Sequence, residues 1–189
     1  MPRTVNVEER ERVVSEAAWR VLERDGLTEL SVRKVAAEAG LPPSSLRYTF
    51  ATQASVREVA ISLILERLAD RIALLSSEAS PAARARAMLL ELLPLDRDRR
   101  TEMEVSLALG AMAMTDATLE LSHQRVMRAV RDLCAAALEL IHAPTAELDG
   151  THALIDGLAL HLVRQPPDAD TDWAVRVVDA HLARVSMGR

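Results

Sequence analysis

Apolar residues at helical spacing are the feature that most constrains this 189-residue chain. They recur three and four positions apart, as in Val14, Ala17, Ala18, Val21 and Leu22, which share one face of a helix. No stretch shows the strict alternation, bounded by turn residues, of a half-buried strand. Only 2% of the residues are aromatic, which also argues against sheets. The sequence therefore predicts an all-α protein.

Capping residues, glycines and prolines divide this pattern into about nine helices. Asn6, Ser31, Thr52 and Asp116 are the predicted N-caps, and the sequence TEME at 101–104 is interpreted as a capping box that opens a helix. The expected helices are residues 7–24, 32–39, 43–50, 53–77, 81–94, 101–114, 117–142, 145–164 and 171–187.

A break at Gly40-Leu41-Pro42-Pro43 separates two of the shortest helices. Each proline disfavours the α conformation of the residue before it, so this segment cannot lie inside a helix. Pro43 suits the first position of a new helix, where its missing N–H costs nothing. Two short helices joined by a tight turn that contains glycine predict a helix-turn-helix.

The helix after this break has two different faces. Leu46 and Phe50 are four residues apart and are expected to pack inward, whereas Ser44, Arg47 and Tyr48 form an outward stripe. An arginine can donate two hydrogen bonds to guanine O6 and N7, and hydroxyl groups suit phosphates or base edges. The stripe therefore favours a helix that reads DNA, and a merely solvated surface is the alternative.

The segment 13–59 resembles the DNA-binding region of the tetracycline-repressor (TetR) family. The resemblance rests on ERDGL, LSVRKVAAEAGL and SLRYTF, which follow one another in register. The segments LPLDRDRRTEMEVSLALGAMAMTD and LIDGLALHLV are similar to the branch that includes the choline-responsive regulator of betaine synthesis. The family consists of homodimeric bacterial transcription regulators, mostly repressors, that a small molecule releases from palindromic DNA. The resemblance implies a DNA-binding domain at 1–52 and a ligand-binding and dimerisation domain at 53–189.

Nine residues are predicted to contact the DNA operator. They lie on the two short helices or at the start of the next one, and they are Arg33, Lys34, Ser44, Ser45, Arg47, Tyr48, Thr49, Thr52 and Gln53. The sequence departs from the family pattern at four places, two of which are Arg47, where an aromatic residue is frequent, and Thr49, where a tyrosine or histidine is frequent. Pro42-Pro43-Ser44 stands where Ser-Lys-Gly is frequent, and Gln53 replaces the usual phosphate-binding lysine. The operator sequence therefore cannot be taken from relatives.

The segment 105–114, VSLALGAMAM, is apolar nearly all round and is expected to be buried. Methionines and small side chains can line an adaptable pocket, which favours a small and largely apolar effector or an amphiphile with one polar end. The predicted effector-binding residues are Arg67, Met88, Met103, Leu107, Gly110, Ala111, Met114, Asp116 and His123. Ordinary core packing is the alternative for each methionine.

The last two expected helices carry broad apolar faces, in ALIDGLALHLV and DWAVRVVDAHLARV. The family resemblance implies that these helices pair with their copies in a homodimer. The predicted interface residues are Leu154, Leu158, His161, Trp173, Val177, Val178 and His181. Packing within one subunit is the alternative.

Metal and catalytic sites are not expected. Glu120/His123 and Glu139/His142 have the spacing of di-metal ligands, but they lie 19 residues apart on one expected helix and cannot converge on one ion. Cys134 is interpreted as a small buried apolar residue. No glycine-rich phosphate loop or nucleophile elbow is present, so neither an enzyme nor a cofactor is expected. A helical-bundle enzyme or carrier that does not bind DNA is the remaining alternative.

The charge balance bears on the partner and on the compartment. A net charge of −5 argues against indiscriminate coating of nucleic acid, and the first 60 residues carry nine basic and nine acidic residues. No run of apolar residues is long enough to span a membrane, and the N-terminus lacks the apolar stretch of a secretory signal. These features predict a cytoplasmic protein.

Overall fold

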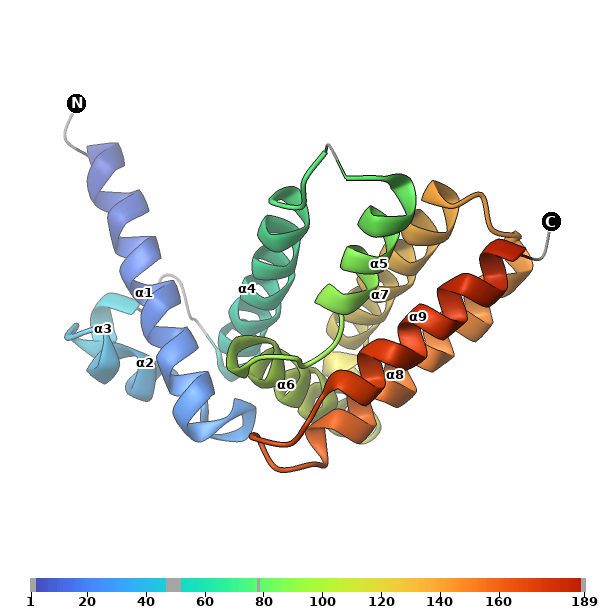
Figure 1. Ribbon diagram of the computed structural model, residues 1–189. Helices are drawn as coiled ribbons and strands as arrows, with labels where there is room; N and C mark the ends of the chain where they lie inside the picture. Colours follow the sequence, from blue (N-terminus) through green and yellow to red (C-terminus); the bar gives the residue numbers. More distant parts are fainter. Residues whose placement is uncertain (1–2, 47–51, 78, 188–189) are drawn as a thin grey trace. The chain divides into compact units, whose positions relative to one another are not determined.

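The computed structural model describes residues 3–46, 52–77 and 79–187, and every regular element in this part of the chain is helical (Figure 1). The α-helices are α1 (Arg3–Asp25), α2 (Val32–Glu38), α3 (Pro43–Leu46), α4 (Gln53–Ala73), α5 (Pro81–Glu91), α6 (Arg97–Ala113), α7 (Glu120–Leu140), α8 (Leu148–Val163) and α9 (Asp172–Met187). Short 3₁₀ turns are η1 (Leu27–Glu29), η2 (Ala117–Leu119) and η3 (Thr145–Glu147). The predicted all-α fold with about nine helices is confirmed.

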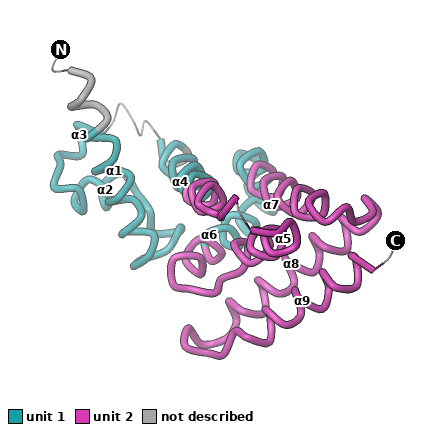
Figure 2. Tube along the Cα trace, turned by 45° about the horizontal axis from the view of Figure 1, so that its top comes forward, with its two compact units in different colours: residues 1–66, 105–123 teal, residues 67–104, 124–189 magenta. Residues whose placement is uncertain are grey.

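The chain forms two compact units, which Figure 2 colours separately. The first unit comprises residues 1–66 and 105–123, and the second comprises 67–104 and 124–189. Helices α4, α6 and α7 each contribute residues to both units. The predicted functional division after residue 52 stays a prediction.

In the first unit, α1 packs against α2, and α2 packs against α3. The apolar stripe of α1 is buried as predicted, from Val14 at 4% exposed to Val21 at 0%. Trp19 is also buried, which agrees with a packing role. Gly26 has φ +79° and donates its N–H to the carbonyl of Leu22, so α1 ends at the predicted glycine.

In the second unit, the core forms between α5, α7, α8 and α9, and α8 and α9 lie side by side (Figure 1). Cys134 is fully buried in this core, and burial raises the pKa of its thiol to about 12. A thiol held neutral in this way is inert, which confirms its interpretation as a small apolar residue.

Two predicted helix starts are wrong. α1 already begins at Arg3, so Asn6 lies within the helix and does not cap it. α6 begins at Arg97, four residues before TEME, because the Asp96 carboxylate accepts the backbone N–H of Arg99 at 2.8 Å. The hydroxyl of Thr101 instead donates to the carbonyl of Arg97 in the preceding turn. A carboxylate at the positive end of the helix dipole therefore prevails over the capping box.

The other predicted caps accept backbone N–H groups, but Asp116 caps the 3₁₀ turn η2, and α7 begins only at Glu120, three residues later than expected. The side chains of Ser31, Thr52 and Asp116 accept backbone N–H groups at 3.3, 3.1 and 3.0 Å. Three helices end at least two residues earlier than expected, α4 at Ala73, α5 at Glu91 and α7 at Leu140. His142 has φ +53°, a left-handed conformation that cannot continue the helix.

Candidate nucleic-acid interface and effector region

The turn between α2 and α3 leaves the N-terminal end of α3 exposed. Gly40 adopts φ +67°, and the N–H of Leu41 donates to the carbonyl of Ala36 at 2.9 Å, which closes α2. Pro43 then begins α3 as predicted. Leu46 is fully buried while Ser44 is exposed, so the two predicted faces of this helix are present in its described residues.

The predicted DNA contacts differ in their surroundings. Arg33 and Thr52 are exposed, and Ser45 is half-buried with its hydroxyl donated to the carbonyl of Pro42 at 2.7 Å. The ammonium group of Lys34 lies 3.0 Å from carboxylate oxygens of both Asp25 and Glu29. Gln53 begins α4. Three predicted contacts, Arg47, Tyr48 and Thr49, and the predicted core residue Phe50 lie outside the described residues, as does the side chain of Gln53.

Exposed ion pairs join α2 to α1, and we call this set the α1–α2 cluster: Arg20, Arg24, Asp25, Glu29, Lys34 and Glu38. Glu38 receives hydrogen bonds from Arg20 and Arg24, each at 2.8 Å. Arg24, followed by Arg20, holds the pKa of Glu38 below its ordinary value. The hydrogen bonds that the Lys34 ammonium group donates to Asp25 and Glu29 raise its pKa. The cluster therefore holds α2 against α1. In the protein without DNA, the charge of Lys34 is paired with the carboxylates of Asp25 and Glu29.

Arg10 makes a contact near the candidate site that the sequence pattern did not reveal. Its guanidinium donates to the carbonyl of Ser45 at 2.7 Å and thereby joins α1 to α3 across 35 residues. Arg10 lies outside the apolar stripe of α1, so helical spacing marks it only as exposed. The contact attaches the helix predicted to read DNA to the longest helix of its unit.

Polar groups of α4, α6 and α7 meet in the first unit. The Arg57 guanidinium lies 3.8 Å from Asp116, and the Ser122 hydroxyl donates to Glu58. Hydrogen bonds from Thr118 lower the pKa of Asp116. Gly110 packs directly against His123, since a Cβ added at this glycine would lie 3.1 Å from the ring carbon Cε1. Gly110 therefore serves close packing between α6 and α7, and a larger side chain there would displace the histidine ring.

The expectation that 105–114 is buried all round is wrong for this subunit. Val105 and Leu109 are buried, but Ala111 is exposed and Met114 is 86% exposed. Leu107 is half-buried. Met88 is 6% exposed within the core of the second unit, and Met103 packs against that core. Both methionines thus fill a core, as their alternative interpretation stated, and their contact with an effector stays a prediction.

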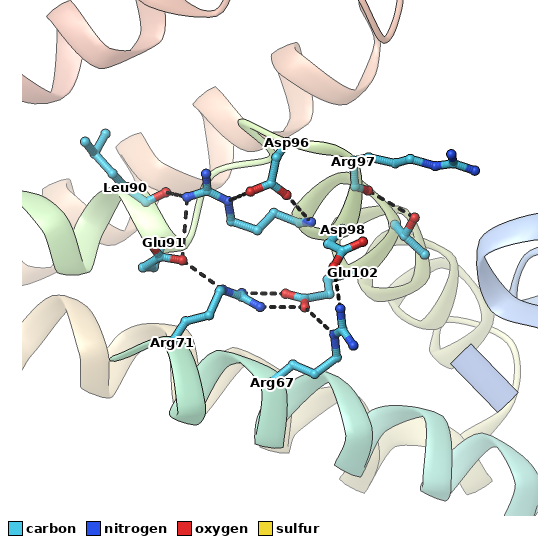
Figure 3. A network of polar contacts seen from close by, with 10 residues as sticks. Arg67, Arg71, Leu90, Glu91, Asp96, Arg97, Asp98 and Glu102 are labelled. Carbon is cyan, nitrogen blue, oxygen red and sulfur yellow. Dashed lines mark hydrogen bonds and ion pairs between the residues drawn. The ribbon is translucent and has the colours of Figure 1, made fainter. Parts of the chain in front are cut away.

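A second ionic network lies among α4, α5 and α6, and we call it the α4–α6 network: Arg67, Arg71, Glu91, Arg99 and Glu102 (Figure 3). Arg71 binds Glu102 through two hydrogen bonds of 2.7 Å and binds Glu91 at 2.8 Å. Arg67 forms ion pairs with Asp98 and, at 3.4 Å, with Glu102. Burial lowers the pKa of Arg71, but the two carboxylates outweigh that effect and raise it. Sequence reasoning proposed only Arg67 from this network.

A cleft of about 480 Å³ lies over the α4–α6 network. Its walls are charged, namely Arg67, Asp70, Arg71 and residues 96–99. This lining differs from the apolar wall that the sequence predicts for an effector pocket.

The predicted dimer residues divide by burial. Val178 and Leu158 are 0% and 6% exposed in the core of one subunit, so their side chains already pack within it. His181 lies 2.8 Å from the hydroxyl of Thr151 in the same subunit. The other predicted members retain accessible surface: Leu154, His161, Trp173 and Val177.

Metal ligation and membrane insertion find no support in the described part of the chain. Residues 3–46, 52–77 and 79–187 contain no cluster of three or more His, Cys, Asp or Glu side chains that could hold an ion. None of the helices described there combines the length and apolar character needed to cross a membrane.

A helix-turn-helix attached to a helical bundle defines the class of one-component DNA-binding regulators. The family model of BetI-type transcriptional repressors, C-terminal part, matches residues 81–186. The HTH-type transcriptional regulator PksA of Bacillus subtilis is 31% identical over 192 residues, which cover 98% of this chain and 94% of PksA. The chain belongs to the TetR family of transcriptional regulators. It is a ligand-responsive DNA-binding regulator and not an enzyme.

Solved structures agree with this assignment. A transcriptional regulator from Rhodococcus sp. Rha1 is 25% identical, with a TM-score of 0.76 over 94% of this chain and 96% of that one. The multidrug binding protein EbrR, solved in complex with ethidium, is 26% identical, with a TM-score of 0.67 over 91% of this chain and 98% of EbrR.

Proposed function

We propose that this protein is a homodimeric repressor that reads an inverted-repeat operator through α3 and is released by a small, largely apolar molecule. The observation that carries this proposal is the geometry of α3. Its apolar residue Leu46 is buried, its N-terminal Ser44 is exposed, and the turn at Gly40 sets it against α2. A helix held in this way can enter a major groove with its N-terminal residues foremost. We place the protein in the cytoplasm, where such an operator is accessible.

Different residues would supply sequence reading and general affinity. Arg47 would read a base edge, with Ser44, Ser45, Tyr48 and Thr49 beside it, because a guanidinium recognises guanine by two hydrogen bonds. Arg33, Lys34, Thr52 and Gln53 would bind phosphates. Lys34 would exchange its carboxylate partners for a phosphate, which its partly exposed position on α2 allows.

Subunit pairing would use the accessible residues of α8 and α9. A two-fold axis through these helices presents two copies of α3 to successive major grooves, so the operator should be an inverted repeat. Val177 and His161 are the exposed predicted members of the interface. These two residues are suitable test positions, whereas a charge at the fully buried Val178 would disrupt the core of the subunit itself.

The effector would be recognised by shape and apolar contact. The two tryptophans, one tyrosine and one phenylalanine of the chain lie at positions 19, 173, 48 and 50, so residues 51–172 contain no tryptophan, tyrosine or phenylalanine. A quaternary ammonium ion is commonly bound by an aromatic cage, which this segment cannot form. EbrR was solved with ethidium and with imidazole. We therefore propose a small organic effector held by leucine, methionine and alanine side chains.

Selection of DNA from a random library tests the function directly. The purified protein should enrich one sequence with two inverted half-sites about 10 base pairs apart, centre to centre, or a multiple of this. Enrichment of a single half-site would contradict pairing through α8 and α9. A library that remains random after selection would contradict the proposed function as a whole.

Sedimentation at micromolar concentration tests the interface. The variant carrying Val177→Glu and His161→Glu should sediment as a monomer and bind the selected DNA weakly. Leu121→Glu is the matched control, because Leu121 is 74% exposed on α7 and lies outside the proposed interface. A dimer that persists in the double variant would rule out these residues as the pairing surface.

A further inference from the structure

One turn of α6 contacts three other helices of the second unit. Successive residues of an α-helix point about 100° apart, so Arg99, Arg100 and Glu102 face different neighbours. Arg99 donates to the carbonyl of Leu90 at 3.1 Å and lies 3.5 Å from Glu91, both on α5. Glu102 accepts both hydrogen bonds of the Arg71 fork from α4 (Figure 3).

Arg100 reaches the C-terminal end of α8. Its guanidinium donates to the carbonyls of Leu162, Val163 and Gln165 at 3.3, 2.6 and 2.9 Å. The last carbonyls of a helix have no partner within it, and they form the negative end of the helix dipole. Arg100 therefore caps α8 from α6, and its side chain is only 17% exposed.

Glu102 is the corresponding contact on the α4 side. Its carboxylate is 9% exposed and lies between Arg71 and Arg67, which both belong to α4. A buried carboxylate of this kind holds its partners in place. If α4 or α6 moved alone, a charge would be left unpaired in a poorly hydrated site. The same turn of α6 thus holds α4 on one side and α8 on the other.

We propose that Arg100 and Glu102 are positioning residues that couple α8 to α4 through α6, so that a change at one helix alters the stability of the other. α8 carries predicted pairing residues, and α4 follows the segment predicted to read DNA. The relevance of this coupling to regulation rests on the proposed function, in which the effects of subunit pairing and effector binding would reach α4 through this turn of α6. The coupling itself is a property of the protein alone.

Hydrogen exchange measured by mass spectrometry on the full-length protein tests this coupling without an effector or DNA. Arg100→Gln removes the cap of α8, and Glu102→Gln removes the charge that holds α4. Arg100→Gln should speed exchange about tenfold in α4, whose hydrogen bonds to this turn run through Glu102. Glu102→Gln should do the same at 158–163 in α8, whose hydrogen bonds to this turn run through Arg100. Asp179→Asn is the matched control, since it breaks the exposed Arg86–Asp179 pair between α5 and α9.

The cross-effects decide the outcome. Faster exchange at both remote helices, absent from Asp179→Asn, supports the coupling. Changes confined to the directly contacted helix, a cross-effect in one direction only, or the same changes in the control overturn it. If either glutamine variant fails to fold, Arg100→Lys and Glu102→Asp are compared by the same criteria. Failure of DNA selection by the native protein would instead contradict the proposed function. The exchange results would still test the coupling between α8 and α4.

Discussion

The two units each contain a network of arginines and carboxylates, but the networks differ in exposure. In the α1–α2 cluster, the side chains range from 20% exposed at Asp25 to 62% exposed at Glu29. In the α4–α6 network, they range from 9% exposed at Glu102 to 31% exposed at Arg67. Water screens the first set, whereas the second set interacts in a medium of lower dielectric constant.

This difference assigns the networks different roles. Exposed pairs contribute little to stability and exchange partners readily, which suits cations that must turn to phosphates when DNA arrives. Buried pairs are costly to break once one partner is removed, so they fix the relative positions of helices. Under the proposed function, the same residue types would serve DNA binding in the first unit and helix positioning in the second.

The largest expected effect comes from breaking the buried network. Glu102→Ala leaves Arg71 with Glu91 alone, and we expect a loss of about 3 kcal/mol in the free energy of unfolding. Glu29→Ala in the α1–α2 cluster is the comparison variant, because Glu29 is 62% exposed and its loss leaves Lys34 with Asp25. We expect its urea midpoint to stay near that of the native protein. Equal shifts of the urea unfolding midpoint in both variants would remove the distinction between the two networks.

The next effect concerns sequence reading in the first unit. Arg47→Ala should cost roughly 1–3 kcal/mol of affinity for the selected DNA and little for random DNA. Arg33→Ala should weaken both alike and flatten the salt dependence, as the loss of a phosphate contact does. Fluorescence anisotropy titrations at several salt concentrations separate the two classes. Equal loss on both DNAs for Arg47→Ala would assign Arg47 to the phosphate class.

A smaller effect is expected at Arg10. If Arg10 only positions α3 through the carbonyl of Ser45, Arg10→Gln should cost about 1 kcal/mol of specific affinity and leave the salt slope unchanged. Arg12→Gln is the control, because Arg12 pairs with Glu9 and Glu16 on its own helix. A salt slope reduced by about one charge in Arg10→Gln would show that Arg10 binds a phosphate instead.

The smallest effect is a pH dependence in the second unit. Burial, followed by the charge of Arg184, lowers the pKa of His181 below its ordinary value of 6.5, against the opposing charge of Glu147. The unfolded chain then binds more protons in the window below 6.5, so stability should fall as pH decreases through that window. Urea midpoints at about pH 7.5 and 5.5 should differ less in His181→Gln than in the native protein. An identical difference in both proteins would exclude His181 as the source.

Local features of the fold could be predicted from the sequence because they depend on neighbours within one or two turns. The caps at Ser31 and Asp116, the stop at Gly26 and the buried stripe of α1 are of this kind. The helix start predicted at TEME is wrong because Asp96, a few residues earlier, also favours a helix start. The TEME motif alone does not show which of the two starts prevails. The family resemblance added the class of function.

The contacts that shape the candidate site depend on distant segments. Arg10 meets Ser45 across 35 residues, Arg71 meets Glu102 across 31, and Arg100 meets Val163 across 63. The spacing of residues within one helix does not predict such long-range pairs. Met114 illustrates the same limit of sequence analysis. An apolar residue is buried only when another surface covers it, and the helical spacing does not show whether such a surface is present.

The assignment of DNA reading to the first unit is tested most directly by comparing two DNAs of equal length and composition. The native protein is titrated against its selected sequence and against a shuffled version of it, at the same salt concentration. We expect the selected sequence to bind at least about 1,000-fold more tightly, as specific regulators do. Equal affinity for the two DNAs would contradict the account, because α3 would then contribute no sequence reading at all.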